Sequence, residues 1–148
     1  MQVRRATAHD RGELLQMALR FIAESSYRGQ IIPDQAQLLG FIDVMLAQGF
    51  LLVADDGDAA VGMLAGVVMT HPISGERVAT ELAWWMNPER RGSRASLQLL
   101  EYFERWAYRV HQVDAVQMVA PAGSQIGDLY RRRGYAELET TFQRRRAA

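Results

Sequence analysis

Apolar residues return every three or four positions in three long stretches of the chain, the spacing that gives an α-helix one apolar face. The first stretch begins behind a cap made by Thr7 and Asp10 and fades near Ser25. Pro33 and Asp34 open the second stretch, which stops at a glycine. The pattern predicts three helices and a shorter fourth, at residues 7–25, 33–49, 93–111 and 125–132.

Shorter runs of apolar and β-branched residues lie between these helices and predict strands. We expect them at residues 3–6, 50–54, 60–70, 78–86, 115–120 and 138–143. Polar turns at 55–58 and 71–75 join the second, third and fourth strands as consecutive hairpins. A helix, a strand, a short helix and a last strand follow. This order predicts a mixed sheet covered by helices, an α/β protein of the α+β type, and excludes a Rossmann alternation.

The composition narrows the class of protein. The chain has 148 residues, and we expect residues 1–148 to form one domain with its own core. It has no cysteine, which excludes disulfides, thiolate zinc sites and a cysteine nucleophile. The polar start and the lack of an apolar run of about 20 residues argue against a signal peptide and a membrane span. We therefore expect a cytoplasmic protein with no membrane partner.

The net charge argues against a nucleic-acid-binding protein, and the histidine content argues against a metal site. The 17 basic and 17 acidic side chains give a formal net charge of zero. A protein that binds nucleic acid by neutralising phosphates carries a basic excess, so we expect no nucleic-acid partner. The three histidines lie far apart without a carboxylate-rich ligand pattern, so we expect no metal site.

The segment after the strand at 78–86 has the features of an anion site. A polar loop containing Gly92 leads into a long helix near Ser93, where backbone N–H groups have no intrahelical partner and the helix dipole is positive. Arg91 and Arg94 add formal positive charge there. Such a junction either binds a phosphate or simply connects two elements, and these features alone leave both alternatives open.

Three motifs resemble those of the GNAT superfamily of acetyltransferases. The loop at 88–96 resembles the family's diphosphate loop, Arg/Gln-x-x-Gly-x-Gly/Ala, with Arg91 at the first position. The run Leu-Tyr-Arg-Arg-Arg-Gly-Tyr at 129–135 resembles the family's Leu-Tyr-x-x-x-Gly-Phe, and residues 5–10 resemble its usual start. Two positions depart from the loop pattern, because Arg94 replaces the first glycine and Ser96 stands at the Gly/Ala position. With the element order, the resemblance spans essentially the whole chain.

The resemblance implies a GNAT fold, a mixed and mostly antiparallel sheet of six to seven strands flanked by about four helices. It implies acetyl-CoA as cosubstrate and transfer of the acetyl group to a primary amine by direct attack. A main-chain N–H near Trp85 or Met86 would meet the oxyanion. The cluster from Arg131 to Arg133, Arg133 in particular, would reach the 3′-phosphate of coenzyme A; the alternative is solvated charge on the short helix. The residues expected to hold the diphosphate are Arg91, Gly92, Ser93, Arg94, Ala95 and Ser96.

Two residues are candidates for proton transfer in this reaction. Glu81, on the strand beside the loop, is the best-placed carboxylate to take a proton from the amine, directly or through a water. The alternative is a strand residue that faces solvent or pairs with an arginine. Tyr130 resembles the family tyrosine that lies near the sulfur and is the candidate acid for the departing thiolate. Its alternative is packing under the short helix.

Several alternatives stay open from the sequence. Arg94 either pairs with a phosphate or marks weakened cofactor binding. A non-catalytic module that keeps the fold and binds coenzyme A or a protein partner is therefore the second hypothesis. The acceptor is a small amine, an aminoglycoside-like molecule, a peptide N-terminus or a protein lysine. The resemblance also raises the prospect of a homodimer.

Overall fold

Five strands form one sheet in the order β1-β2-β3-β4-β5 in the computed structural model, which describes residues 1–147. The strands are β1 (Gln2–Arg5), β2 (Phe50–Asp55), β3 (Ala60–Thr70), β4 (Arg77–Met86) and β5 (Ala115–Gln117). The first four pair antiparallel, and β5 pairs parallel to β4. The predicted hairpin series from β2 to β4 is confirmed, and so is the mixed sheet.

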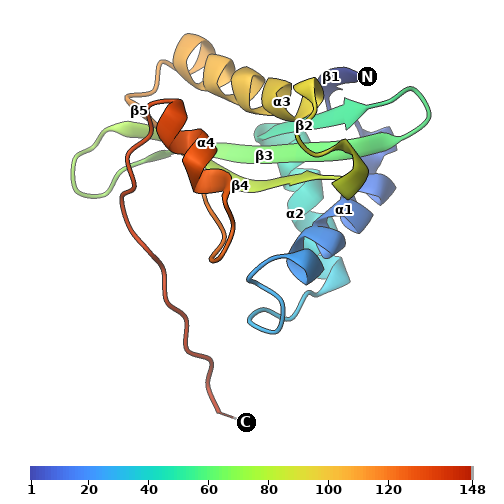
Figure 1. Ribbon diagram of the computed structural model, residues 1–148, viewed down its shortest axis with the longest axis horizontal. Coiled ribbons are helices and arrows are strands. Elements are labelled where there is room, and N and C mark those ends of the chain that lie inside the picture. Colours follow the sequence, from blue (N-terminus) through green and yellow to red (C-terminus); the bar gives the residue numbers. More distant parts are fainter. Residues whose placement is uncertain (148) are drawn as a thin grey trace.

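Four α-helices cover this sheet, as predicted. They are α1 (Arg11–Glu24), α2 (Gln35–Gln48), α3 (Arg94–Arg105) and α4 (Ile126–Arg132). α1 and α2 lie on one face of the sheet and α3 on the other (Figure 1). At the start of α1, Asp10 accepts the main-chain N–H of Thr7 at 2.7 Å, which confirms the predicted cap. α3 continues into a π-helical turn (Trp106–Val110), close to the predicted helix end.

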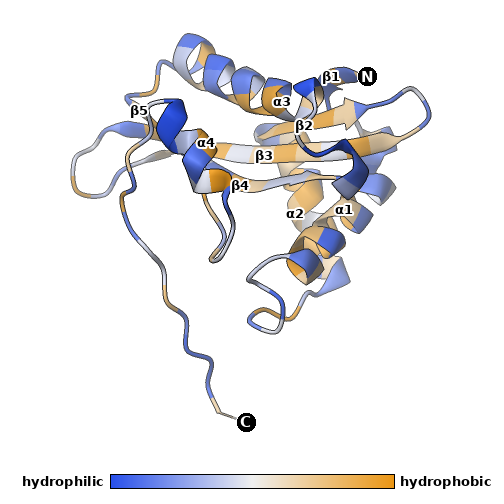
Figure 2. Cartoon of the chain, viewed as in Figure 1, coloured by the Kyte–Doolittle hydropathy of each residue, from blue (hydrophilic) through white to orange (hydrophobic). Residues whose placement is uncertain are grey.

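The apolar residues of the strands separate into two core clusters, one on each side of the sheet. One cluster joins α1 and α2 to the sheet, and the other joins α3 to it. Figure 2 shows the hydrophobic colour gathered along the central strands, with hydrophilic loops around them. Gly66 on β3 allows the close approach of α3, because a Cβ atom there would overlap the ring of Phe103.

A β-bulge in β4 decides which side chains of the second half of this strand lie on each face of the sheet. Gly66 pairs with Glu81 and Ala65 with Ala83, so Leu82 is an extra residue in β4. Strict alternation would place Glu81 on the same face as Trp85. With the bulge, Trp84 packs on the α3 side and Trp85 joins the α1–α2 cluster.

The structure corrects three expectations about strands. The sheet has five strands among the described residues rather than six to seven, and residues 138–143 form no strand. These residues lie in an extended segment that runs away from the sheet (Figure 1). Alternating side chains favour a strand, but a strand also needs a neighbouring edge to bond, and here none is beside it. β5 also ends at Gln117 rather than near residue 120.

None of the helices in the described part of the chain has the length and apolarity needed to cross a lipid bilayer. Within residues 1–147, no group of three or more histidine and carboxylate side chains is placed to hold a metal ion.

Candidate active site

β4 and β5 part after three residue pairs, and a cavity of about 450 Å³ opens where they separate. The last pair is Thr80 with Gln117. Beyond it β4 continues to Met86, while the segment that follows β5 turns away from β4. The cavity is lined by the end of α1, by β4 from Glu81 onward, by the start of α3 and by the segment from residue 119 to 130. Segments from four parts of the chain therefore meet at this opening.

Glu81 is the buried carboxylate of this opening. Its side chain is only 4% exposed, and its Oε2 accepts the main-chain N–H of Val119 at 2.9 Å. Burial raises the pKa of Glu81 to about 7, against the opposing effect of the Val119 hydrogen bond. The other carboxylate oxygen, Oε1, makes no hydrogen bond within the described residues. Every fully buried side-chain oxygen in this part of the chain has a hydrogen-bond partner, so Oε1 must be accessible to solvent. A carboxyl group poised to exchange a proton near neutral pH thus faces the cavity.

Tyr130, on α4, contacts the main chain of the same residue as Glu81 does, Val119. Its hydroxyl donates to the Val119 carbonyl at 3.0 Å, and the residue is 6% exposed. Burial, and then the negative charge of Glu81, raise the pKa of this phenol well above its usual value, so it keeps its proton. Its ring lies 6.3 Å from that of Trp84. The structure therefore brings the two candidate proton-transfer residues together around Val119.

The loop before α3 has free backbone donors close to the cavity, which is lined there by Arg91, Gly92 and Ser96 but not by Ser93, Arg94 or Ala95. Gly92 has a φ of +74°, which favours glycine, and Ser93 caps the helix by accepting the N–H of Ser96 at 3.4 Å. The N–H groups of Arg94 and Ala95 make no main-chain hydrogen bond within residues 1–147. Ala95 is buried and Arg94 is exposed, so the former offers only its main chain. Unpaired donors and a helix N-terminus suit an anion such as a diphosphate.

Arg91 is held by the protein itself. Its Nη2 donates to Glu24 at 2.6 Å and its Nε donates to the Met86 carbonyl at 2.9 Å. Glu24, at the end of α1, also accepts the Trp85 indole N–H at 3.1 Å. Sequence reasoning missed Glu24, because 67 residues separate it from Arg91. Only its position four residues after Arg20 hinted at an ion pair.

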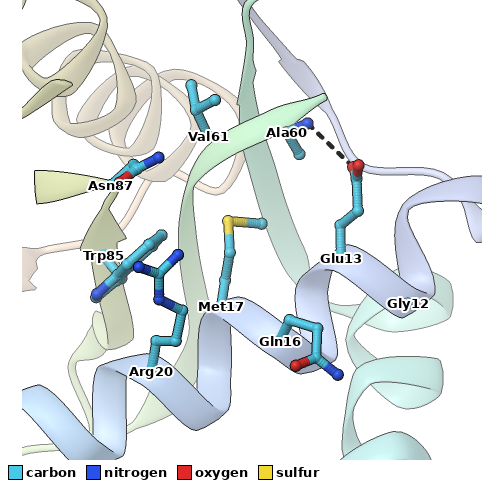
Figure 3. A pocket seen from close by; sticks show the side chains of 9 residues that line it. All are labelled: Gly12, Glu13, Gln16, Met17, Arg20, Ala60, Val61, Trp85 and Asn87. Atoms are coloured by element: carbon cyan, nitrogen blue, oxygen red, sulfur yellow. Dashed lines mark hydrogen bonds between the residues drawn. The ribbon is translucent and has the colours of Figure 1, made fainter. Parts of the chain in front are cut away.

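Met86 rather than Trp85 offers its main chain to the opening. Asn87 donates to the Val61 carbonyl on the β3 side, and alternate residues of a strand direct their N–H groups to opposite sides. The N–H of Trp85 therefore faces β3, and that of Met86 faces the open edge. The Trp85 side chain separates this cavity from a smaller one of about 250 Å³ against α1, where Glu13 accepts the N–H of Ala60 (Figure 3).

The sequence matches one family. The model of the "Acetyltransferase (GNAT) family" matches residues 14–136, which is most of the chain. The protein belongs to the GNAT acetyltransferase family. No curated protein sequence matches the chain significantly.

Solved structures share this GNAT fold at low sequence identity. An aminoglycoside antibiotic 6'-N-acetyltransferase from Acinetobacter haemolyticus has a TM-score of 0.75 and 17% identity, with 100% of this chain and 99% of that chain covered. A predicted acetyltransferase from Clostridium acetobutylicum, solved with acetyl-CoA, has a TM-score of 0.77 and 16% identity, with 97% of this chain and 95% of that chain covered. A ribosomal-protein-alanine N-acetyltransferase from Brucella melitensis biovar Abortus has a TM-score of 0.72 and 14% identity, with 98% of this chain and 99% of that chain covered. These likenesses show the fold.

Arg133, expected to reach a phosphate of coenzyme A, is engaged elsewhere in this GNAT domain. Its Nη2 donates to Glu104 of α3 at 2.6 Å, and the Tyr135 hydroxyl donates to the same carboxylate at 2.9 Å. It does not line the cavity. In this structure Arg133 fastens the end of α4 to α3, a contact that depends on which helix faces lie together.

Proposed function

We propose that this protein transfers the acetyl group of acetyl-CoA to a primary amine by direct attack, in the opening between β4 and β5. One observation carries the proposal. Glu81 is a buried carboxyl group whose pKa is raised to about 7, with one oxygen open to a cavity that also meets Tyr130 and the α3 N-terminus. Perturbed titratable groups in a cleft are typical of acid–base chemistry.

The residues of the opening suit a coenzyme A thioester. Gly92 and Ser96 line the cavity, and the adjacent unpaired N–H groups of Arg94 and Ala95, with the formal charge of Arg94, would supply donors for a diphosphate bound at the start of α3. Arg91 would add a second cation by exchanging Glu24 for the diphosphate. The open edge of β4 leaves main-chain groups for the pantetheine amides.

Each proton has a stated destination in the proposed reaction. Glu81 takes one proton from the ammonium, directly or through a water, and the neutral nitrogen attacks the thioester carbon. The Met86 N–H faces the oxygen on which negative charge develops. As the carbon–sulfur bond breaks, Tyr130 gives its proton to the sulfur and recovers one from the substituted nitrogen. Glu81 finally releases its proton to solvent, so the products are an amide, a thiol and one proton.

A second candidate, a non-catalytic module that binds coenzyme A or a protein, is favoured by two observations. Arg94 and Ser96 occupy glycine or alanine positions of the family loop, and the guanidinium of Arg91 is bound to Glu24. Backbone approach to a diphosphate is easiest at glycine, so both features would weaken the cofactor site.

Titration calorimetry with acetyl-CoA, followed by an assay of released coenzyme A thiol, separates the candidates. The amine panel should contain a small alkylamine, an aminoglycoside, a peptide N-terminus and a protein lysine. Binding with thiol release that requires one of these amines is the result we expect. Binding without turnover on any of them would favour the non-catalytic module, and no binding heat at millimolar acetyl-CoA would refute the proposed function.

A further inference from the structure

The smaller cavity, which lies against α1, has an apolar floor and a polar rim (Figure 3). The floor consists of three buried side chains, those of Met17, Val61 and Trp85. The rim carries four polar side chains, those of Glu13, Gln16, Arg20 and Asn87. An apolar hollow with a few polar groups is typical of a small-molecule site, and the volume of about 250 Å³ suits a ligand smaller than a drug-sized one.

The polar groups of this rim have few partners in the protein. Only Glu13 among them makes a side-chain hydrogen bond within residues 1–147, because its Oε2 accepts the Ala60 N–H at 3.0 Å. The guanidinium of Arg20 lies 5.1 Å from the centroid of the Trp85 ring. Its Nε is 3.8 Å from Oε1 of Glu24, too far for a hydrogen bond. The described chain therefore leaves the N–H donors of Arg20 available to a ligand.

The rim carries one charge of each sign. Glu13 and Arg20 are seven residues apart on α1, so they lie two turns apart on one face of the helix, about 10 Å along its axis. The apolar side chain of Met17 stands between them on that face. A complementary ligand has an ammonium group and a carboxylate at the two ends of a short apolar chain, since a ligand with a single charge would use only one of the two rim charges.

We propose that this pocket is a second ligand site, which binds a small zwitterion of the ω-amino acid type. Its ammonium group lies at Glu13, its methylene chain covers Met17 and Val61, and its carboxylate pairs with Arg20. The Trp85 side chain lines both this pocket and the larger cavity, so the ligand is close to the candidate active site without occupying it.

Occupation of the pocket opposes cofactor binding, an effect that rests on the function proposed above. Glu24 is shared by two cations, since Arg20 lies 3.8 Å from its Oε1 and Arg91 lies 2.6 Å from its Oε2. A carboxylate that pairs with Arg20 reduces the positive charge beside Glu24 and adds a negative charge nearby. Glu24 then holds Arg91 more firmly, and Arg91 is less free to turn toward a diphosphate. By linkage, the cofactor weakens binding of the zwitterion by the same factor.

An NMR titration of the full chain with ε-aminocaproate tests the site. It uses no cofactor, so its result does not depend on the proposed function. We expect the side-chain amide signals of Gln16 and Asn87 to shift saturably, with a dissociation constant in the millimolar range, because exposed ion pairs contribute little. Caproate, which lacks the ammonium group, should bind more weakly than ε-aminocaproate.

Substitutions at the two rim charges show whether the probe lies in this pocket. Arg20→Gln should weaken binding of both probes about fivefold or more. Glu13→Gln can still accept the Ala60 N–H and should abolish the preference for ε-aminocaproate over caproate. Arg28→Gln and Glu76→Gln, at exposed positions outside the pocket, are the matched controls and should bind as wild type does. The absence of saturable binding to wild type, or a preference that survives Glu13→Gln, overturns the site.

Calorimetry with coenzyme A, which has no acetyl group to transfer, tests the coupling. Saturating ε-aminocaproate should weaken coenzyme A binding about two- to fivefold in wild type and leave it unchanged in Arg20→Gln. An unchanged affinity in wild type overturns the coupling. Failure of coenzyme A to bind at all overturns the proposed function together with the coupling, and so differs from the result that refutes the site.

Discussion

Replacing Glu81 with glutamine should change the pH dependence of folding stability in a way that can be worked from the structure. The glutamine side chain is neutral, has the same shape, and can accept the Val119 N–H as the Glu81 carboxylate does at 2.9 Å. The pKa of Glu81 rises from 4.5 to about 7 on folding because the carboxyl group is desolvated. At about 1.4 kcal/mol per pKa unit, this difference corresponds to about 3 kcal/mol.

The sign follows from proton binding in the two states. Below pH 4.5 both states hold the proton, and burial of the carboxyl group carries no ionisation cost. Between 4.5 and about 7 the unfolded chain loses the proton while the folded one keeps it, so stability falls as pH rises. Above about pH 7 both states are ionised, and the folded protein bears the full free-energy cost of burying a charged carboxylate. Glu81→Gln removes it and should be more stable than wild type by about 3 kcal/mol there, and by nothing near pH 4.

Urea denaturation at pH 4, 6 and 8 measures this difference for the two proteins side by side. All other groups titrate in both proteins, so the difference between their unfolding free energies isolates Glu81. Glu76→Gln, at an exposed position in the turn before β4, controls for removal of one carboxylate. A difference that does not change with pH, or a wild type more stable than the variant at pH 8, would refute the buried, proton-holding carboxyl group.

The other predictions concern the rate, the cofactor and the packing of the sheet. Tyr130→Phe should bind acetyl-CoA as wild type does and lose about a hundredfold or more in kcat; an undiminished rate removes this residue from proton transfer. Glu24→Gln frees Arg91 for the diphosphate, so calorimetry should show acetyl-CoA bound about two- to fivefold tighter. Asp43→Asn, which breaks the Arg11 ion pair on the outer surface, is its control and should leave affinity unchanged. Gly66→Ala should lower the unfolding free energy by about 1–3 kcal/mol through overlap with α3, and an unchanged urea midpoint would contradict that packing.

Local patterns predict the elements, and long-range contacts explain most of what those patterns miss. The helices and the β2–β4 hairpins are predictable because side-chain period and turn residues lie within a few positions of each other. The extra residue Leu82 is not, although it decides which way Glu81 points, since one inserted residue reverses the alternation of a strand. The pattern at 138–143 predicts a strand but carries no information on whether an edge lies beside it.

The candidate site residues divide in the same way. Glu81 and Tyr130 are predictable from the strand beside the loop and from the family motifs, and the structure adds that both contact one peptide, that of Val119. The pairing of Arg91 with Glu24, and the use of Arg133 to join α4 to α3, depend on which helix faces meet. No spacing within the sequence reports that.

The pH dependence of kcat/KM for acetyl transfer, compared between wild type and Glu81→Gln with the best amine of the panel, tests the central claim most directly. Because Glu81 must be ionised to take the proton, the wild-type value should rise through a pKa near 7. The variant should lose that rise together with most of its activity. A variant that keeps both the rise and the wild-type rate would contradict the assignment of Glu81 as the base and, with it, this account of the site.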